Sequence, residues 1–134
     1  MPDFSANLGF LWTDKSLPEA IHAAHAAGFV AVECHWPYDT PPEDVAAALN
    51  ETGLPMLGLN TLRGDVAGGE NGLSALPGRE SEARAAIDQA LTYAQAIGAA
   101  CVHVMAGNTG DAAAHKTFID NLTYACAKAG EENI

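Results

Sequence analysis

The chain has 134 residues, of which 49% are hydrophobic and 17% charged, a balance typical of an ordinary globular domain. Its formal net charge of -11 argues against nucleic acid and anionic membranes as partners, because phosphate groups bind to basic surfaces. No apolar run approaches the ~20 residues of a membrane-spanning helix. Since their spacing matches no metal site, we expect Cys34, Cys101 and Cys126 to be small buried hydrophobic residues of a cytoplasmic protein.

Four β-type runs alternate with helical stretches along the chain. The predicted strands are Phe4–Gly9, Phe29–His35, Pro55–Asn60 and Ala100–Ala106. The sequence Ser16-Leu-Pro-Glu19 predicts a capping box that begins the first helix, which ends at Gly28. The sequence Thr40-Pro-Pro-Glu43 repeats this signal, with Gly53 as the end of the second helix. The third helix is predicted from about Glu80 to Ile97, and the fourth from about Ala112 to Ala129, before Gly130.

This alternation predicts right-handed βαβ units and a parallel sheet, either open and doubly wound or part of a closed barrel. Neither a G-x-G-x-x-G motif after the first strand nor a P-loop motif occurs, which weakens the dinucleotide and P-loop interpretations. The alternation of side chains along the strands distinguishes the two architectures. One side of each of the first three strands is apolar: Phe4, Ala6 and Leu8; Val30, Val32 and Cys34; Leu57 and Leu59. The opposite side becomes polar toward the C-terminal end: Ser5, Asn7 and Gly9; Ala31, Glu33 and His35; Met56, Gly58 and Asn60.

An apolar side suits an outer layer of helices, and a side with a polar C-terminal end suits a barrel interior. We therefore predict an α/β fold of the (β/α)8 TIM-barrel type, with only the first four β-α units present. This half-barrel would form a single domain over residues 1–134. Asn7, Glu33 and Asn60 would then lie at similar heights near the rim of one enclosed interior.

Two of the predicted strands contain a histidine. Glu33 and His35 point the same way, so they could act in acid-base catalysis or hold a metal, or form a structural ion pair in the barrel interior. For His103, inside the fourth strand, we expect a hydrogen-bonded core histidine rather than a functional group.

The segment from Thr61 to Arg79, TLRGDVAGGENGLSALPGR, is far longer than usual for a βα connection. Long loops at this end of a barrel commonly cover the substrate, which we favour over a plain exposed insertion. Its leucines, Ala75 and Pro77 could pack it down, while Arg63, Asp65, Glu70 and Arg79 supply polar contacts. The arginines would either bind an anionic metabolite or pair with Glu70, Glu80 and Glu82.

The segments FSANLGFLW, VAVECHWPYD, NTLRGDVAGGENGLSALPGRE and YAQAIGAACVHVMAG together resemble the N-terminal half of hydroxypyruvate isomerases, which are xylose-isomerase-like barrels. The resemblance implies interconversion of hydroxypyruvate and 2-hydroxy-3-oxopropanoate through an enediolate, so the expected partner is a small hydroxy-keto acid. In that family two glutamates, on the fifth and eighth strands, are the acid-base pair, and related enzymes hold a divalent metal there.

The chain stops at Ile134, where the fifth strand would begin, so no catalytic residue or metal ligand can be carried over. The residues that can be carried over form the near wall of the substrate pocket: Asn7, Glu33, Asn60, Arg63, Glu70 and Arg79. Arg63 is the first choice for the substrate carboxylate, because a guanidinium offers a bidentate match. We expect the chain alone to be inactive and to need the missing C-terminal half.

Two alternatives stay open. One is a non-catalytic half-barrel that self-associates, because its first and last strands would leave open edges. The other is a sugar epimerase or isomerase of the same superfamily, which spacing alone does not exclude. An endonuclease of that superfamily needs metal-binding histidines at strand ends, and the Met105-Ala-Gly-Asn108 end of the fourth strand argues against it.

Overall fold

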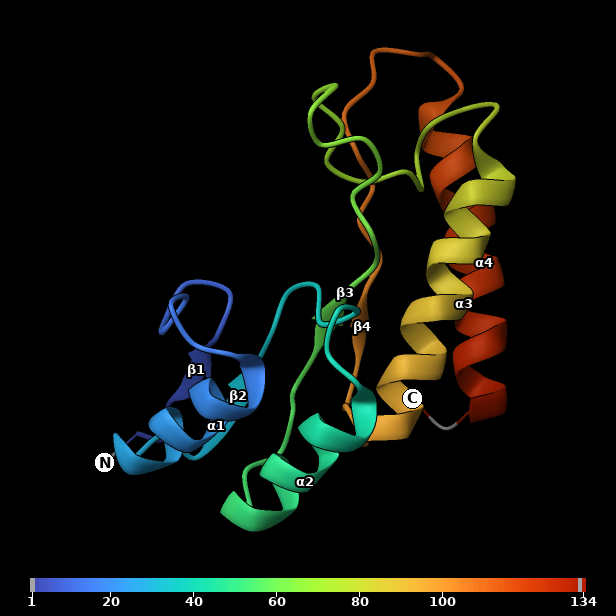
Figure 1. Cartoon of the computed structure of the whole chain (residues 1–134). Helices are drawn as coiled ribbons and strands as arrows, with labels where there is room; N and C mark the ends of the chain where they lie inside the picture. Colours follow the sequence, from blue (N-terminus) through green and yellow to red (C-terminus); the bar gives the residue numbers. More distant parts are fainter. Residues whose placement is uncertain (1, 133) are drawn as a thin grey trace. The chain divides into compact units, whose positions relative to one another are not determined.

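A computed structural model describes residues 2–132 and residue 134. Within this part of the chain, four short strands alternate with four helices in the predicted order (Figure 1). The strands are β1 (Ser5–Asn7), β2 (Ala31–Glu33), β3 (Leu59–Asn60) and β4 (Val102–His103). The helices are α1 (Leu17–Ala26), α2 (Pro42–Thr52), α3 (Glu80–Ile97) and α4 (Ala114–Glu132). None of the described helices combines the length and apolar character needed to cross a bilayer.

The chain divides into two compact units, and the division passes through α3. The first unit comprises Met1–Leu59 and Tyr93–Val102, and the second comprises Asn60–Thr92 and His103–Ile134. Each unit is described separately below. The prediction of one domain over residues 1–134 stays a prediction.

The first unit is built on a parallel pair of strands. β1 and β2 pair in the register Ser5 with Ala31, Ala6 with Val32 and Asn7 with Glu33. Val32 also forms a parallel bridge to Met56, which extends the ladder toward the third predicted strand. The core combines sheet residues with residues of α1 and α2, among which Ala6, Ile21, Val32 and Val45 are fully buried. Parallel pairing of consecutive strands joined by a helix confirms the predicted βαβ arrangement.

Helix boundaries follow the capping signals in part. The Ser16 backbone N–H and hydroxyl both donate to the Glu19 carboxylate, at 2.9 and 2.7 Å, which fixes the start of α1. The capping box predicted at Thr40 is wrong, because α2 begins one residue later with Pro41 as its N-cap, and the Thr40 carbonyl instead accepts the hydroxyl of Tyr93 at 2.8 Å. The predicted end at Gly130 is also wrong, since α4 continues to Glu132. One glycine costs a helix only about 1 kcal/mol, which the rest of α4 offsets.

The predicted alternation of strand faces holds where the ladder is regular. Ala6 and Val32 are fully buried, as expected for the apolar face. In the third segment the expectation is wrong, because Met56 is 1% exposed and Leu57 is 39% exposed. In this segment only β3 pairs with β4, and residues 57 and 58 before it are not part of a strand. The side chains at residues 57 and 58 therefore do not follow the strict period-2 alternation of a strand. Val30, which precedes β2, is likewise exposed.

The cysteine prediction is correct for one residue of three. Cys34 is buried, whereas Cys101 and Cys126 are exposed, which contradicts the expectation for both. Cys101 precedes β4, and its thiol donates to the Leu57 carbonyl at 3.0 Å. An apolar sequence environment therefore did not ensure burial at these positions.

In the second unit, the part of α3 up to Thr92 packs beside α4 (Figure 1). β3 and β4 form a two-stranded sheet, through which the division between the units also passes. The Tyr124 hydroxyl of α4 donates to the Asp88 carboxylate of α3 at 2.7 Å. The guanidinium of Arg84 lies over the Tyr124 ring, 5.0 Å from its centroid. These contacts hold the two helices together along the stretch that supports the long loop after β3.

Candidate functional site

Asn7 and Glu33 lie side by side at the C-terminal ends of β1 and β2. They are partners in the parallel register, so their side chains leave the sheet on the same face. Both side chains are half-buried. The Asn7 Oδ1 atom accepts the Gly9 backbone N–H at 2.9 Å, so the amide shapes the loop while its Nδ2 group can still donate. The structure therefore brings together two of the predicted site residues within the first unit.

The loop after β1 turns sharply at the strand end. The Asn7 carbonyl accepts the N–H groups of Phe10 and Leu11, at 3.1 and 3.0 Å. Trp12 has φ 54°, in the left-handed region that residues other than glycine rarely adopt. Such strain persists only where the surroundings enforce it, and it concentrates at functional sites.

An aromatic cluster lies at these strand ends. The rings of Phe10 and His35 meet edge-on with centroids 4.8 Å apart, and the His35 and Trp36 centroids are 5.0 Å apart. His35 is packed so closely on Gly9 that a Cβ atom there would overlap its ring. His35, predicted as a partner of Glu33 in acid-base or metal chemistry, is thus part of a packed cluster.

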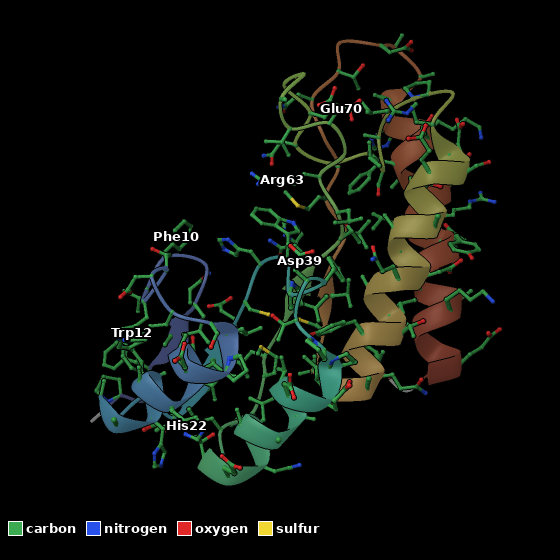
Figure 2. The ribbon with its side chains drawn as sticks, viewed as in Figure 1. Phe10, Trp12, His22, Asp39, Arg63 and Glu70 are labelled. Atoms are coloured by element: carbon green, nitrogen blue, oxygen red, sulfur yellow. The ribbon has the colours of Figure 1, made fainter. Side chains whose placement is uncertain are left out.

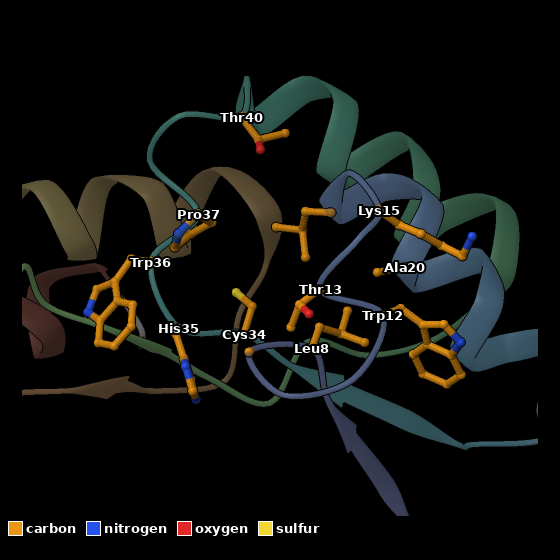
Figure 3. A pocket seen from close by; sticks show the side chains of 12 residues that line it. Leu8, Trp12, Thr13, Lys15, Ala20, Cys34, His35, Trp36, Pro37 and Thr40 are labelled. Carbon is orange, nitrogen blue, oxygen red and sulfur yellow. The ribbon is translucent and has the colours of Figure 1, made fainter.

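A pocket of about 270 Å³ opens beside this cluster (Figure 3). It is lined by the ends of β1 and β2, the loop after β1 and the start of α1, with Trp12, Lys15, Cys34 and His35 among its residues. Burial raises the pKa of the Cys34 thiol to about 12, and the nearby Glu33 carboxylate adds to this shift. Cys34 is therefore a protonated, unreactive wall of the pocket at neutral pH.

In the second unit, Asn60 and His103 form a side-chain pair at the ends of β3 and β4. The His103 Nδ1 and Asn60 Oδ1 atoms are 3.3 Å apart, and His103 is exposed. The expectation of a core histidine at position 103 is therefore wrong. The position of His103 at the end of a strand, next to a strand that ends in asparagine, is the sequence signal that could have identified it as a candidate site residue.

The first half of the long loop is held by a charged cluster around Glu70, whose place in the chain Figure 2 shows. Arg79 pairs with Glu70 and with Glu82, with 2.5 Å contacts in each case. Glu70 also accepts the Asp65 backbone N–H at 2.6 Å. Hydrogen bonds from Arg79, followed by that from Asp65, lower the pKa of the Glu70 carboxyl, which is therefore ionised at neutral pH.

The predicted polar residues of the loop thus differ in what they contact. The guanidinium of Arg79 lies between the carboxylates of Glu70 and Glu82. Of the two roles considered for the arginines, Arg79 therefore has the pairing with glutamates. Arg63 follows β3 and is half-buried (Figure 2). The assignment of Arg63 to the substrate carboxylate stays a prediction, while Arg79 and Glu70 form an ion pair within the loop.

The second half of the loop is anchored by the segment after β4 and by α4. Asn121, fully buried on α4, donates from Nδ2 to the Ser74 carbonyl at 2.9 Å. The Ser74 and Ala75 N–H groups donate to the carbonyls of Met105 and Ala106, at 3.2 and 2.8 Å. Sequence patterns did not identify Asn121, because a lone asparagine in a helix carries no signal of a partner 47 residues away.

The described residues contain no group of three or more histidine, cysteine or acidic side chains placed to hold a metal ion. The divalent metal that the resemblance implies therefore has no ligand set in this part of the chain. Within the first unit the strand ends present the side chains of Asn7 and Glu33, and within the second unit those of Asn60 and His103.

Parallel β-α units with polar side chains at the C-terminal strand ends define the class of TIM-barrel proteins. Residues 21–134 match the family model described as "Xylose isomerase-like TIM barrel". The chain belongs to this family, and the predicted (β/α)8-type fold is confirmed.

The chain spans about half the length of the curated relatives it matches. It is 41% identical over 140 residues to a Mus musculus protein named "Putative hydroxypyruvate isomerase", covering 98% of this chain and 50% of the relative. It is 44% identical over 138 residues to the "2-oxo-tetronate isomerase" of Pectobacterium atrosepticum, covering 100% of this chain and 53% of the relative. These matches confirm the resemblance to hydroxypyruvate isomerases.

Solved structures agree on the fold. A crystal structure titled as an AP endonuclease, family 2, from Brucella melitensis superposes with a TM-score of 0.93 at 37% identity, covering 100% of this chain and 53% of that one. A D-allulose 3-epimerase from Methylomonas sp. superposes with a TM-score of 0.77 at 16% identity, covering 98% of this chain and 49% of that one. At that identity the likeness to the epimerase concerns the fold alone.

Proposed function

We propose that this chain forms half of the barrel of an isomerase that interconverts hydroxypyruvate and 2-hydroxy-3-oxopropanoate through an enediolate. The observation that carries the proposal is the match of nearly the whole chain to relatives named as isomerases of small 2-oxo acids. We further propose that the chain is inactive alone, because the family's acid-base glutamates lie on strands beyond the fourth. Its partner in catalysis is then a second polypeptide segment that supplies the other half of the barrel.

The chemistry of this reaction explains which groups this half would supply. The substrate carries a carboxylate, which a guanidinium binds through two parallel hydrogen bonds. Charge develops on the enediolate oxygens in the transition state, where fixed donors such as the Asn7 amide stabilise it. We assign carboxylate binding to Arg63 and contacts with the substrate's oxygens to Asn7, Glu33 and Asn60. Glu70 and Arg79 hold the loop that carries Arg63, through the ion pair described above.

Fragment complementation tests the proposal. The purified 134-residue chain is assayed alone and after mixing with the separately produced remaining half of the mouse relative, with conversion of hydroxypyruvate followed by NMR. We expect no turnover by either half and measurable turnover by the mixture. Turnover by the chain alone refutes its inactivity. A soluble 1:1 complex that converts neither hydroxypyruvate nor 2-oxo-tetronate refutes the isomerase assignment.

The role of Arg63 has its own test in the mixture. Arg63→Gln removes charge-assisted hydrogen bonds that contribute about 1.5–3 kcal/mol, so kcat/KM should fall roughly 10- to 100-fold. Lys116→Gln removes the same charge from an exposed position on α4 and should leave kcat/KM unchanged within about twofold. Equal effects of both substitutions would show that only overall charge matters.

A further inference from the structure

The contact between Asn60 and His103 bears on which nitrogen of the imidazole carries a proton. The Asn60 Oδ1 atom lies 3.3 Å from His103 Nδ1, and an amide oxygen accepts but cannot donate, so this orientation favours the tautomer with the proton on Nδ1. In that tautomer, the Nε2 atom of the neutral ring carries a lone pair and accepts hydrogen bonds. The neighbour on the adjacent strand thus favours one tautomer of this histidine.

The location of the pair suits contact with a ligand. β3 ends at Asn60 and β4 at His103, and the Thr61 N–H donates to the His103 carbonyl at 3.0 Å, which fixes the two strand ends together. His103 is exposed, whereas Asn60 is half-buried, so the asparagine supports the ring from its Nδ1 edge. In a TIM barrel, the C-terminal strand ends are where substrates bind.

We propose that His103 is a catalytic residue of the isomerase and that Asn60, besides its contact with the substrate, positions the His103 ring, an inference that rests on the proposed function. Isomerisation of hydroxypyruvate moves one proton between two carbon atoms and another between the two oxygens attached to them. The Nε2 atom of His103 takes the hydroxyl proton from O3 as the carbonyl forms at C3. The resulting imidazolium returns that proton to O2, so the O3–H bond breaks, the O2–H bond forms and histidine ends neutral.

The first test concerns the tautomer and needs no activity. Two-bond nitrogen-proton NMR spectra of the 134-residue chain at about pH 8.5 show which nitrogen of each neutral imidazole is protonated. His22 is the internal reference, because its Nε2 atom faces the Glu51 carboxylate at 3.1 Å and must carry the proton there. We expect His103 to be protonated on Nδ1, and on Nε2 in Asn60→Ala. Protonation on Nε2 in the unchanged chain overturns the proposal.

The second test is kinetic and uses the complemented mixture. Loss of an acid-base group lowers kcat by about 10²- to 10⁴-fold, so His103→Gln should do so with little change in KM. Asn60→Ala should lower kcat by a smaller factor, and Asn60→Asp should restore most of it, since a carboxylate also accepts from Nδ1. The control, His115→Gln, changes a histidine on the surface of α4 and should leave kcat unchanged.

The two proposals fail in different ways. A mixture that converts neither substrate refutes the isomerase assignment while the tautomer measurement still stands on its own. An active mixture in which His103→Gln keeps kcat within about threefold refutes the relay and leaves the proposed function intact.

Discussion

Replacement of Asn121 by alanine should weaken the whole fold, because this side chain fixes the long loop to α4. Asn121 is 0% exposed, and its Nδ2 atom donates to the carbonyl of Ser74, a residue only 2% exposed. The lost bond contributes about 1 kcal/mol, and a buried carbonyl without a partner costs about 1–3 kcal/mol more. Arg84, which donates to Asn121 Oδ1 at 3.3 Å, is exposed and can turn to water. We therefore expect Asn121→Ala to lower the free energy of unfolding by about 3 kcal/mol.

Urea unfolding of the 134-residue chain at pH 7, followed by circular dichroism, measures this change. Thr123→Ala is the matched control on the same helix, since the exposed Thr123 hydroxyl bonds only to the Ile119 carbonyl of its own helix, at 2.9 Å. Its effect should stay within about 0.5 kcal/mol. Asn121→Asp removes the same donor and buries a charge, so it should destabilise at least as much as alanine. An Asn121→Ala change below about 0.5 kcal/mol would refute the anchoring role.

Three further predictions concern the packing at Gly9, the exposure of the cysteines and the cap of α1. Gly9→Ala places a Cβ atom inside the His35 ring and should lower the free energy of unfolding by about 1–3 kcal/mol, whereas Gly110→Ala, with open space around it, should change it little; equal unfolding midpoints would contradict the packing. Iodoacetamide at pH 8 should label Cys101 and Cys126 in the folded chain but spare Cys34, whose burial raises its pKa to about 12, until urea is added; mass spectrometry of the labelled peptides decides this. Hydrogen bonds from the Ser16 hydroxyl and N–H lower the pKa of Glu19. A carboxyl group with a lowered pKa stabilises the fold at pH values above its ordinary pKa of 4.5, and this stabilisation is lost as the pH falls through the lowered pKa. The stability difference between the unchanged chain and Ser16→Ala should therefore shrink as the pH falls below the ordinary carboxyl pKa; a constant difference would disprove the linkage.

Helices could be predicted well where a local signal decides their ends. α3 runs over the predicted Glu80–Ile97, because its apolar stripe and the following glycine both depend on neighbouring residues alone. The start of α2 could not be predicted in the same way. A tertiary contact, the hydroxyl of Tyr93 on the Thr40 carbonyl, accompanies the shift of the N-cap from Thr40 to Pro41.

The candidate site was predictable where strand periodicity governs it. Placing Asn7 and Glu33 on one face follows from period-2 alternation, and the register of β1 and β2 adds that they are direct partners. The error at His103 has a different origin. A histidine among valines indicates burial, but exposure depends on which elements cover β4, and no local pattern contains that information.

The length and glycine content of the long loop do not by themselves show whether the loop can move over a substrate. The contacts that the loop makes with the rest of the chain decide this. A loop that covers a substrate by closing over it must have few fixed bonds, because closure exchanges them for contacts with the ligand. Here Gly72 and Gly107 approach so closely that a side chain on either would overlap the backbone of the other. Together with the bonds of Ser74 to Met105 and Asn121, this approach leaves the second half of the loop little freedom to move. Gly72 and Gly107 therefore serve close backbone packing rather than flexibility, so glycine content alone does not show that this half of the loop moves.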